Sequence, residues 1–405
     1  MKVGWRVKTL GELCRIELGS TPARNNSRFW DMEKETSNVW LSIADLRPGL
    51  HPVCNDSKEY VSDEAARNMR IVPRGTLLVS FKLTLGRLAY AGRDLFTNEA
   101  IASLLDIDES ILLKEYLYWA LTVFDWHAAA EGDHKIKGKT LNKKKLKLIP
   151  IPLPPLEEQK QIVAILDETF EGLDRARANV EANLEESRQL LLRHLDIKIA
   201  EYIVRFGIIP INKLADVKGG KRLPKGVKLT AEKTPYPYIT VRDFTEEGTV
   251  SASGLGFITK EIRETILRYT ISSRDVYISI AGTIGKTGIV PEHLEGANLT
   301  ENAAKLVLKD GWRKEYVYWC TRSTDFQAQT RTQTRVAAQP KLALQRLGQI
   351  TIPRADPKTQ EWLSASMSEM RGSVDQLEAS FRAKLVDLSD LRQSLLQKAF
   401  AGELT

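Results

Sequence analysis

Two long stretches of the chain place hydrophobic residues at alternating steps of three and four. The first runs from Leu156 to Leu195 without a proline, and the second occupies residues 358–405. A seven-residue repeat sustained over four to five heptads predicts a coiled-coil helix in each stretch. The predicted core positions are Val163, Leu166, Phe170, Leu173, Val180, Leu184 and Leu191 in the first helix, and Met367, Met370, Val374, Leu377, Phe381, Leu388, Leu391 and Leu395 in the second.

The two predicted helices are expected to pair with each other in antiparallel fashion. A narrow apolar stripe suits a helix partner better than a sheet, although each helix packing on its own neighbouring domain is the alternative. At 1.5 Å per residue, a helix of roughly 40 residues spans about 60 Å. The pair would therefore act as a ruler between whatever lies at its two ends.

The remaining sequence mixes short apolar runs with amphipathic segments. Strands are predicted at 39–43, 76–81 and 101–105, and again at 238–241, 275–280 and 305–308; helices are predicted at 112–123 and 312–321. Strands of this length alternating irregularly with helices indicate an α+β domain, and they leave the strand order open.

Most of these features occur twice, about 200 residues apart. Lys-Glu-Tyr-Leu-Tyr-Trp at 114–119 returns as Lys-Glu-Tyr-Val-Tyr-Trp at 314–319, and the segment 79–87 returns at 278–286. A period this long is too large for a solenoid and indicates two copies of a whole domain followed by a helix. We therefore predict an α+β fold of two tandem pseudo-symmetric α/β domains joined by two long helices that form an antiparallel coiled coil. The predicted boundaries are 1–155 for the first domain, 156–198 for the central helix, 199–357 for the second domain and 358–405 for the C-terminal helix.

Positive charge is concentrated on the two globular copies. Residues 1–155 hold 23 Lys and Arg against 19 Asp and Glu, and residues 199–357 hold 24 against 16, while both helical stretches are net acidic. The whole chain has a formal charge of +7. This distribution suits domains that meet a polyanion while the helices serve another purpose.

Several polar, basic segments rich in turn formers recur at matching places in both copies. They span 19–28, 132–140 with 143–147, 219–228 and 327–335. Lysine and arginine neutralise phosphates, and arginine and amide side chains bind base edges. Such segments are usually solvated loops, but their recurrence favours DNA binding. The candidate residues are Arg24, Asn25, Arg28, Lys137, Lys139 and Lys143 in the first copy, and Lys221, Arg222, Lys225, Arg331, Gln333 and Arg335 in the second.

No recognisable catalytic motif accompanies these segments. Gly282-Thr-Ile-Gly-Lys-Thr lacks the first glycine of a phosphate loop, because Ile280 stands in its place, and Leu153-Pro154-Pro155-Leu156 lacks the polar and aromatic ends of an adenine methyltransferase motif. The five histidines show no zinc spacing. We therefore predict a chain without an active site or a bound metal. Three scattered cysteines, the absence of a signal peptide and the absence of a long apolar run favour the cytoplasm and argue against a membrane.

The two-copy order of motifs resembles the DNA specificity subunit of type I restriction–modification systems. The resemblance covers essentially the whole chain, and its motifs are Gly4-Trp-Arg-Val-Lys-Thr-Leu-Gly-Glu-Leu, Pro150-Ile-Pro-Leu-Pro-Pro-Leu-Glu-Glu-Gln, the segment 278–288 and the closing segment 391–404. One departure is Lys82-Leu-Thr-Leu-Gly-Arg, where the family usually has a second glycine before the threonine. That departure concerns the geometry of the turn in the first copy.

The resemblance implies two target recognition domains, each reading one half of a bipartite, asymmetric sequence in double-stranded DNA. It implies that the helices set the unread gap and dock two methyltransferase subunits, and that restriction subunits can join. S-adenosylmethionine, ATP and Mg²⁺ would then sit on the partner subunits, with no cofactor on this chain. Half-sites about one helical turn apart, near 34 Å, would lie on one side of the duplex. The alternatives are a fused DNA methyltransferase or nuclease and a coiled-coil scaffold without nucleic-acid binding.

Overall fold

The chain is divided into two compact units. The computed structural model describes residues 2, 4–130, 134–135, 138–139, 141–334 and 340–404. Unit 1 comprises Met1–Val180 and Ala383–Thr405, and unit 2 comprises Glu181–Arg382. The division crosses both long helices, α6 (Leu156–Phe206) and α12 (Pro357–Ala401). Each unit therefore holds one globular domain and a stretch of each helix.

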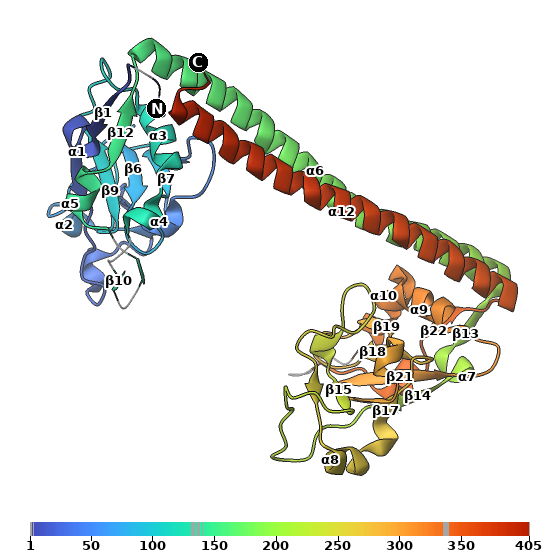
Figure 1. The fold of residues 1–405 in the computed structure, drawn as a ribbon. Coiled ribbons are helices and arrows are strands. Elements are labelled where there is room, and N and C mark those ends of the chain that lie inside the picture. Colours follow the sequence, from blue (N-terminus) through green and yellow to red (C-terminus); the bar gives the residue numbers. More distant parts are fainter. Residues whose placement is uncertain are drawn as a thin grey trace. The chain divides into compact units, whose positions relative to one another are not determined.

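Unit 1 is built on a five-stranded sheet of order β2-β9-β6-β7-β4 and a three-stranded sheet of order β5-β3-β8, with β1 pairing β12 (Figure 1). The strands are β1 (Arg6–Thr9), β2 (Arg15–Leu18), β3 (Val39–Leu41), β4 (Val53–Cys54), β5 (Glu59–Tyr60), β6 (Leu77–Ser80), β7 (Leu88–Ala91), β8 (Phe96–Thr97), β9 (Ile101–Leu105), β10 (His134–Lys135), β11 (Gly138–Lys139) and β12 (Pro150–Leu153). The helices are α1 (Leu10–Leu13), α2 (Asp63–Ala66), α3 (Lys114–Val123), α4 (Trp126–Ala129) and α5 (Lys143–Lys147).

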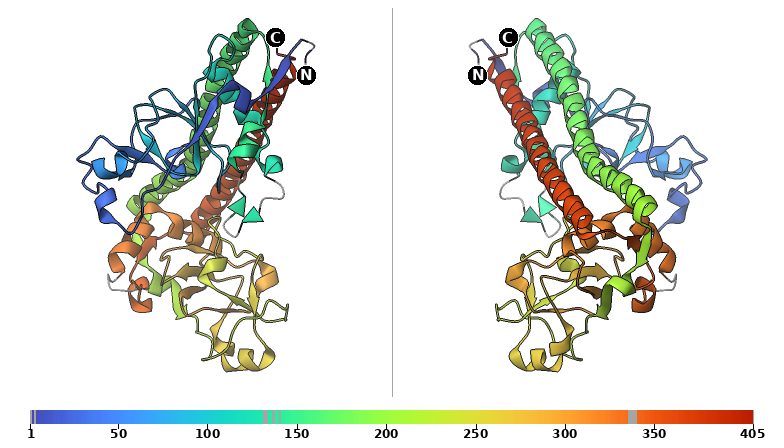
Figure 2. Two further views of the ribbon diagram at one scale, coloured as in Figure 1. Left: turned by 90° about the vertical axis from the view of Figure 1, so that its left-hand side faces the viewer. Right: turned by 90° about the vertical axis from the view of Figure 1, so that its right-hand side faces the viewer.

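Unit 2 repeats this plan with sheets of order β14-β21-β18-β19 and β16-β15-β20-β17, and with β13 pairing β22. Its strands are β13 (Ile208–Pro210), β14 (Ala215–Gly219), β15 (Pro237–Ile239), β16 (Gly256–Phe257), β17 (Thr270–Ile271), β18 (Val276–Ser279), β19 (Thr287–Ile289), β20 (Ala297–Leu299), β21 (Ala303–Leu308) and β22 (Thr351–Pro353). Its helices are α7 (Ile211–Leu214), α8 (Lys260–Thr265), α9 (Lys314–Arg322), α10 (Thr324–Gln333) and α11 (Leu344–Leu347). Within this unit α8 and α10 lie at opposite ends (Figures 1 and 2).

The predicted strands and helices of the globular copies are present with small shifts at their ends. β9 has the predicted bounds, and β6, β18 and α3 fall inside their predicted ranges. The strand predicted at 39–43 ends at Leu41 instead. It stops there because Ser42 caps a short 3-10 helix, Ile43–Asp45, whose Asp45 carboxylate accepts bonds from the Ser42 backbone and hydroxyl.

In unit 1 the core joins the sheet to α3 and to both long helices. One buried cluster joins the β6 region, α3 and both long helices. It contains Leu77, Val79 and Phe81 of the β6 region, Tyr116, Leu117 and Trp119 of α3, Ile162, Leu166 and Phe170 of α6, and Ala399 of α12. The rings of Trp119 and Phe170 are 4.5 Å apart, edge to face. A side chain of this size buried at such a junction contributes about 2 to 3 kcal/mol.

The other ends of the long helices are buried in the core of unit 2. Leu191, Leu195, Ile199 and Tyr202 of α6 and Leu363, Met367 and Val374 of α12 pack with Tyr316, Val317 and Cys320 of α9. This packing explains why α6 continues to Phe206, beyond the predicted end at residue 198. The helix ends before Gly207, whose positive φ of 73° is a conformation that glycine adopts without strain.

The two long helices run antiparallel within each unit (Figures 1 and 2). In unit 1 the Arg392 guanidinium donates to Asp174 at 2.7 Å, and in unit 2 that of Arg188 donates to Glu378 at 3.1 Å. Residue numbers rise on one helix as they fall on the other, as an antiparallel pair requires. Both helices also enter the globular cores, but they do so in addition to pairing with each other, so the alternative of packing on a domain in place of pairing is wrong.

The seam of α12 differs from the predicted one at two positions. Leu377 is 46% exposed and Leu391 is 47% exposed, so neither is a core residue. The next residue in each case turns inward instead and forms an ion pair with α6. Glu378 pairs with Arg188, and Arg392 pairs with Asp174. The prediction followed apolar residues, whereas the helical phase set by Val374, Phe381, Leu388 and Leu395 carries these two charged residues into the seam.

Candidate nucleic-acid interface

A tight turn after the central strand is built identically in both units. In unit 1 the Ser80 hydroxyl donates to the Thr84 carbonyl at 2.6 Å and accepts the Arg87 backbone N–H at 2.9 Å. In unit 2 Ser279 makes the same two bonds, to Thr283 and from Lys286. The turn therefore survives the missing glycine in the first copy, and Leu83 adopts the left-handed φ of 63° that Gly282 adopts at 74°.

A close backbone contact holds each basic loop against the turn between two strands. A Cβ on Gly19 would lie 2.1 Å from the Thr97 carbonyl oxygen, and one on Gly220 would lie 2.0 Å from that of Thr300. Only glycine permits this approach, which positions the loops that begin at Ser20 and Lys221. Each loop thus starts beside the acidic residue of the turn, Glu99 in unit 1 or Glu301 in unit 2.

The first group of predicted DNA-binding residues in unit 1 gathers beside an aromatic pair. The Arg24 guanidinium lies 4.1 Å from the Trp30 ring centroid and 4.7 Å from that of Trp40, and it forms an ion pair with Glu59. Asn25 lines a cavity of about 340 Å³ together with Arg24 and Trp30. Arg28 is exposed on the neighbouring 3-10 helix Ser27–Phe29.

Of the second group in unit 1, Lys143 lies on α5. Lys143 begins this helix and its ammonium is 3.3 Å from a Glu17 carboxylate oxygen. Segment 143–147 is a helix, although its composition is typical of a solvated loop, and Asn142 caps its N-terminus by accepting the Lys145 N–H. Lys139 lies in β11, and Lys137 lies outside the described residues.

Three predicted residues of unit 2 lie on one loop. The Lys221 ammonium is 5.7 Å from the Tyr269 ring, the Arg222 Nε donates to Glu301 at 2.6 Å, and Lys225 is exposed. This loop contacts the β20–β21 turn through the Lys221 N–H, which donates to the Leu299 carbonyl at 2.8 Å.

The remaining candidates of unit 2 lie elsewhere, on α10. The polar run at 327–335 has a composition typical of a solvated loop, with amides and arginines at alternate positions, but its residues through Gln333 are helical. Alternate positions on a helix point about 200° apart, so they share no face. Gln327 donates to the Gly285 and Thr321 carbonyls, and its amide is used inside the fold. Arg331 is exposed on the helix, Gln333 ends it, and Arg335 lies outside the described residues.

Carboxylates neutralise several of the predicted basic residues. The pKa of Glu301 lies below its usual range: burial raises it, but hydrogen bonds from Arg222, its own backbone N–H and Thr300 together lower it further. The pKa of Glu17 is lowered in the same sense, because Lys143, Arg70 and Arg15 outweigh the effect of burial. Both acids are therefore ionised at neutral pH and reduce the charge that Arg222 and Lys143 offer to a phosphate.

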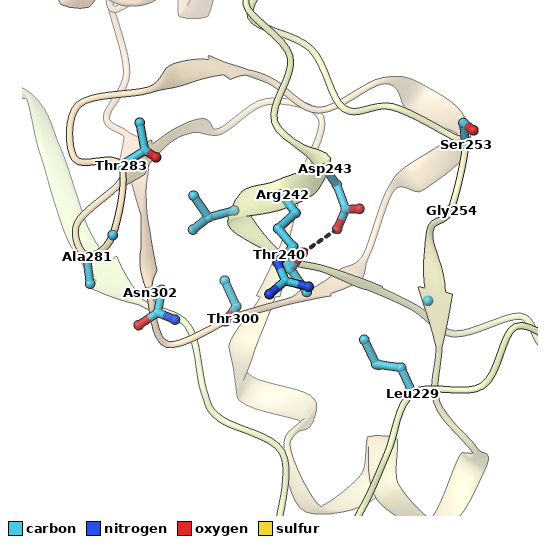
Figure 3. Close-up of a pocket in the computed structure, with 13 residues that line it drawn as sticks. Leu229, Thr240, Arg242, Asp243, Ser253, Gly254, Ala281, Thr283, Thr300 and Asn302 are labelled. Carbon is cyan, nitrogen blue, oxygen red and sulfur yellow. Dashed lines mark hydrogen bonds between the residues drawn. The ribbon is translucent and has the colours of Figure 1, made fainter. Parts of the chain in front are cut away.

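A cavity of about 710 Å³ in unit 2 brings together polar side chains that the sequence reading missed. It is lined by Arg242 of the short 3-10 helix Val241–Asp243, by Thr283 of the tight turn and by Asn302 beside β21, with Gly254 on the opposite wall (Figure 3). A sequence signal for Arg242 was available. The segment Thr240-Val-Arg-Asp matches Ser42-Ile-Ala-Asp of the first copy, and Arg242 stands at the one exposed position of this capped turn.

Chemistry of other kinds finds little support in the part of the chain that the structure describes. Across these residues, no three His, Cys, Asp or Glu side chains are grouped so as to hold a metal ion. The helices among them include none that is both long and apolar enough to cross a bilayer.

A duplicated α+β domain with basic loops, attached to an antiparallel helix pair, defines a protein with two recognition domains in tandem. The family model described as the type I restriction modification DNA specificity domain matches residues 2–185 and again residues 204–369. The chain belongs to this family, and the globular domain of each unit lies within one of the two matches.

Known proteins support this assignment. The chain is 25% identical over 331 residues to the type I restriction enzyme EcoBI specificity subunit of Escherichia coli. The aligned region covers 74% of this chain and 68% of that protein. It is 26% identical over 170 residues to the MjaIX specificity subunit of Methanocaldococcus jannaschii, covering 40% of this chain and 37% of that protein. A solved chain described under complex assembly and conformational transition of the type I R-M system shares the fold, with a TM-score of 0.78, 17% identity and coverage of 100% of this chain and 99% of that one.

Proposed function

We propose that the chain is the non-catalytic specificity subunit of a type I restriction–modification complex and reads a bipartite, asymmetric sequence in double-stranded DNA. One observation carries the proposal: the family model matches twice, and the two units share capped turns, glycine contacts and a four-strand order, β2-β9-β6-β7 in unit 1 and β14-β21-β18-β19 in unit 2. Two sibling domains with different loops suit two different half-sites. The basic loops 20–28 and 221–228 would contact the phosphates that flank them.

In this proposal the helix pair fixes the unread gap between the half-sites. Support comes from the unbroken α6, which takes part in both units, and from the interhelical ion pairs Arg392–Asp174 and Arg188–Glu378. Helices locked by charge pairs in a shared seam resist sliding, because a change of register would separate both pairs.

The same proposal places two methyltransferase subunits on the helices and leaves room for restriction subunits. Leu190, Ile197 and Val204 of α6 are 55%, 65% and 88% exposed, and they recur every seven residues on one face of the helix. An aliphatic stripe at this spacing is suited to a helical partner. S-adenosylmethionine, ATP and Mg²⁺ would be held by the partner subunits, and the complex would work on DNA in the cytoplasm.

The decisive experiment is methylome sequencing. The chain is expressed with a type I methyltransferase subunit from its own genome in a host without restriction–modification systems. We expect methylated adenines within one bipartite motif that has a fixed gap. Absence of any motif, in a complex shown to assemble, would contradict the proposal, and methyl transfer by the purified chain alone would favour the fused-enzyme alternative.

A second measurement separates DNA reading from pure scaffolding. Duplex binding by the complex should weaken linearly on a plot of log affinity against log salt concentration, because phosphate contacts release counterions. A flat salt dependence without sequence preference would support the coiled-coil scaffold instead.

Docking on the stripe is tested with Leu190→Ser, Ile197→Ser and Val204→Ser together. We expect the methyltransferase to be lost from the complex in size-exclusion chromatography, while the helical content of the chain is retained. The matched control changes Glu186, Arg193 and Ala200 to serine, three exposed residues with the same spacing on α6. Retention of the methyltransferase by the triple stripe variant would show that the stripe is not the docking face.

A further inference from the structure

The cavity of unit 2 contains an arginine that the fold leaves without a partner. Arg242 is exposed, and its guanidinium extends into the space between Thr283, Thr300 and the loop at Ser253 and Gly254 (Figure 3). Among the described residues it forms no ion pair and no side-chain hydrogen bond. By contrast, Arg24 is paired with Glu59 and Arg222 with Glu301. Of these three arginines, Arg242 has its full hydrogen-bonding capacity available to a ligand.

The backbone that presents Arg242 is held rigidly. The Asp243 carboxylate, which is 9% exposed, accepts the Thr240 backbone N–H at 2.7 Å and the Thr240 hydroxyl at 2.8 Å through Oδ2. These two bonds close a capping box around the 3-10 helix and direct the neighbouring carboxylate toward Thr240. A side chain on a fixed turn loses less freedom on binding than one on a mobile loop.

The cavity wall adds neutral polar groups around the guanidinium. Asn302 and Thr283 line it from the β20–β21 and β18–β19 turns, and no hydrogen bond engages the Asn302 side chain within the described segments. A guanidinium that can donate two parallel hydrogen bonds, beside an amide and a hydroxyl, suits the edge of a base pair better than it suits a single phosphate.

The corresponding positions of unit 1 differ in kind. Within the matching capped turn, Ala44 stands where unit 2 has Arg242, and Lys82 and Leu83 stand where unit 2 has Ala281 and Gly282. Ala100 replaces Asn302. The cavity chemistry is therefore specific to unit 2, as expected of a device that distinguishes one half-site from the other.

We propose that Arg242 determines the specificity of unit 2 by reading a guanine in the major groove. Its two terminal nitrogens would donate to O6 and N7 of one guanine, the pairing that the planar guanidinium fits best. This inference rests on the proposed function and deepens it, since it assigns one base and one residue to the half-site read by unit 2.

The test compares methylomes of the complex with wild-type chain, Arg242→Gln, Arg242→Lys and the control Arg268→Gln, an exposed arginine that does not line the cavity. We expect Arg242→Gln to make one G·C position degenerate in one half-site only. Discrimination at that position should fall about 10- to 100-fold in competition binding. Arg242→Lys should also relax it, because an ammonium cannot make the bidentate contact, and Arg268→Gln should leave the motif unchanged.

Several outcomes would overturn the inference without touching the proposed function. They are an unchanged motif in Arg242→Gln, degeneracy in both half-sites, or uniformly weaker binding to every sequence, which would mark Arg242 as a phosphate contact. Failure of the proposed function looks different, because the wild-type complex would then yield no bipartite motif. Arg242→Lys retains charge and bulk, so it guards against a variant that merely fails to fold.

Discussion

At the residue scale, Leu83 and Gly282 occupy one position in two copies of the same turn. Leu83 has a φ of 63° and is 58% exposed, so it adopts a strained backbone without burying its side chain. For residues with a Cβ this conformation costs roughly 1 to 2 kcal/mol. The hydrogen bonds of Ser80 impose it, because they fix the turn from both sides. Strain retained on an exposed turn of a recognition domain is a reason to examine Leu83 in DNA binding.

Leu83→Gly should therefore stabilise unit 1. Relief of the strain is partly offset by the greater freedom of glycine in the unfolded chain, which leaves a gain of about 1 kcal/mol. The change in the free energy of unfolding is measured by urea unfolding, monitored through hydrogen exchange of the unit 1 amides. The converse variant, Gly282→Ala, should destabilise unit 2 by a similar amount, and stabilisation of unit 2 by that change would contradict the argument.

Glu17 makes the stability of unit 1 depend on pH, and the sign of this dependence can be predicted. Its pKa lies below the ordinary value because Lys143, Arg70 and Arg15 outweigh burial, so its stabilising effect is complete above the unfolded pKa of about 4.3. That effect is lost as the pH falls through the folded pKa. The difference in Tm between wild type and Glu17→Gln should thus shrink from pH 6 to pH 3. Glu33→Gln, a change at an exposed position, should show no such convergence.

At the scale of elements, a buried glutamine ties the first turn of each long helix to its domain. Gln159 Oε1 accepts the Leu113 N–H, and its Nε2 donates to the Ile111 and Pro154 carbonyls. Gln360 makes the matching three bonds to Arg313, Gly311 and Ala355. Both side chains are almost fully buried. The amide thus satisfies backbone groups ahead of α3 and α9 that water cannot reach, and it fixes where each long helix departs.

Gln159→Ala should destabilise unit 1 by about 2 to 4 kcal/mol, because it strands buried donors and acceptors and removes packing. Gln360→Ala should do the same to unit 2. Hydrogen exchange resolved by unit measures both losses. The neighbouring exposed position provides the control, Gln161→Ala, which should stay within about 0.5 kcal/mol of wild type. Comparable losses in Gln159→Ala and Gln161→Ala would refute a role for the buried bonds.

At the scale of the whole molecule, the C-terminal segment belongs to the unit formed by the N-terminal residues. Residues 383–405 are part of unit 1, where Ala399 is fully buried and Leu388, Leu395 and Phe400 pack against the core. The Tyr116 and Phe400 rings are 5.4 Å apart. The first domain is thus completed by a segment that follows the whole of unit 2 in the sequence.

Truncation after Arg382 should therefore unfold unit 1 preferentially and leave unit 2 protected. Limited proteolysis with mass spectrometry locates the cleavage sites, which we expect within residues 4–180. A point variant makes the same test without a truncated end: Ala399→Glu should destabilise unit 1, whereas Gln397→Glu, at an exposed position, should not. Preferential cleavage of unit 2 in the truncated chain would show that residues 383–405 stabilise unit 2, and it would contradict the prediction.

Much of this architecture follows from local patterns. The duplication, the long helices and most strands were predictable, because heptad spacing and short apolar runs reflect contacts between near neighbours in sequence. The site was less accessible. Lys221, Arg222 and Lys225 do share a loop, but Arg331 and Gln333 lie on a helix. Arg242 was missed because its signal, the match of Thr240-Val-Arg-Asp with Ser42-Ile-Ala-Asp, does not reveal that the side chain lines a cavity.

The sequence by itself determined that there are two sibling α+β domains, two antiparallel heptad helices and basic loops, since each depends on composition or periodicity along the chain. Only the tertiary structure decided which residues are neutralised and which are free. Whether Arg222 meets Glu301, whether Leu377 or Glu378 enters the seam, and which walls surround Arg242 depend on side chains that are distant in sequence. Such pairings are set by the packing of whole elements, and no local pattern encodes them.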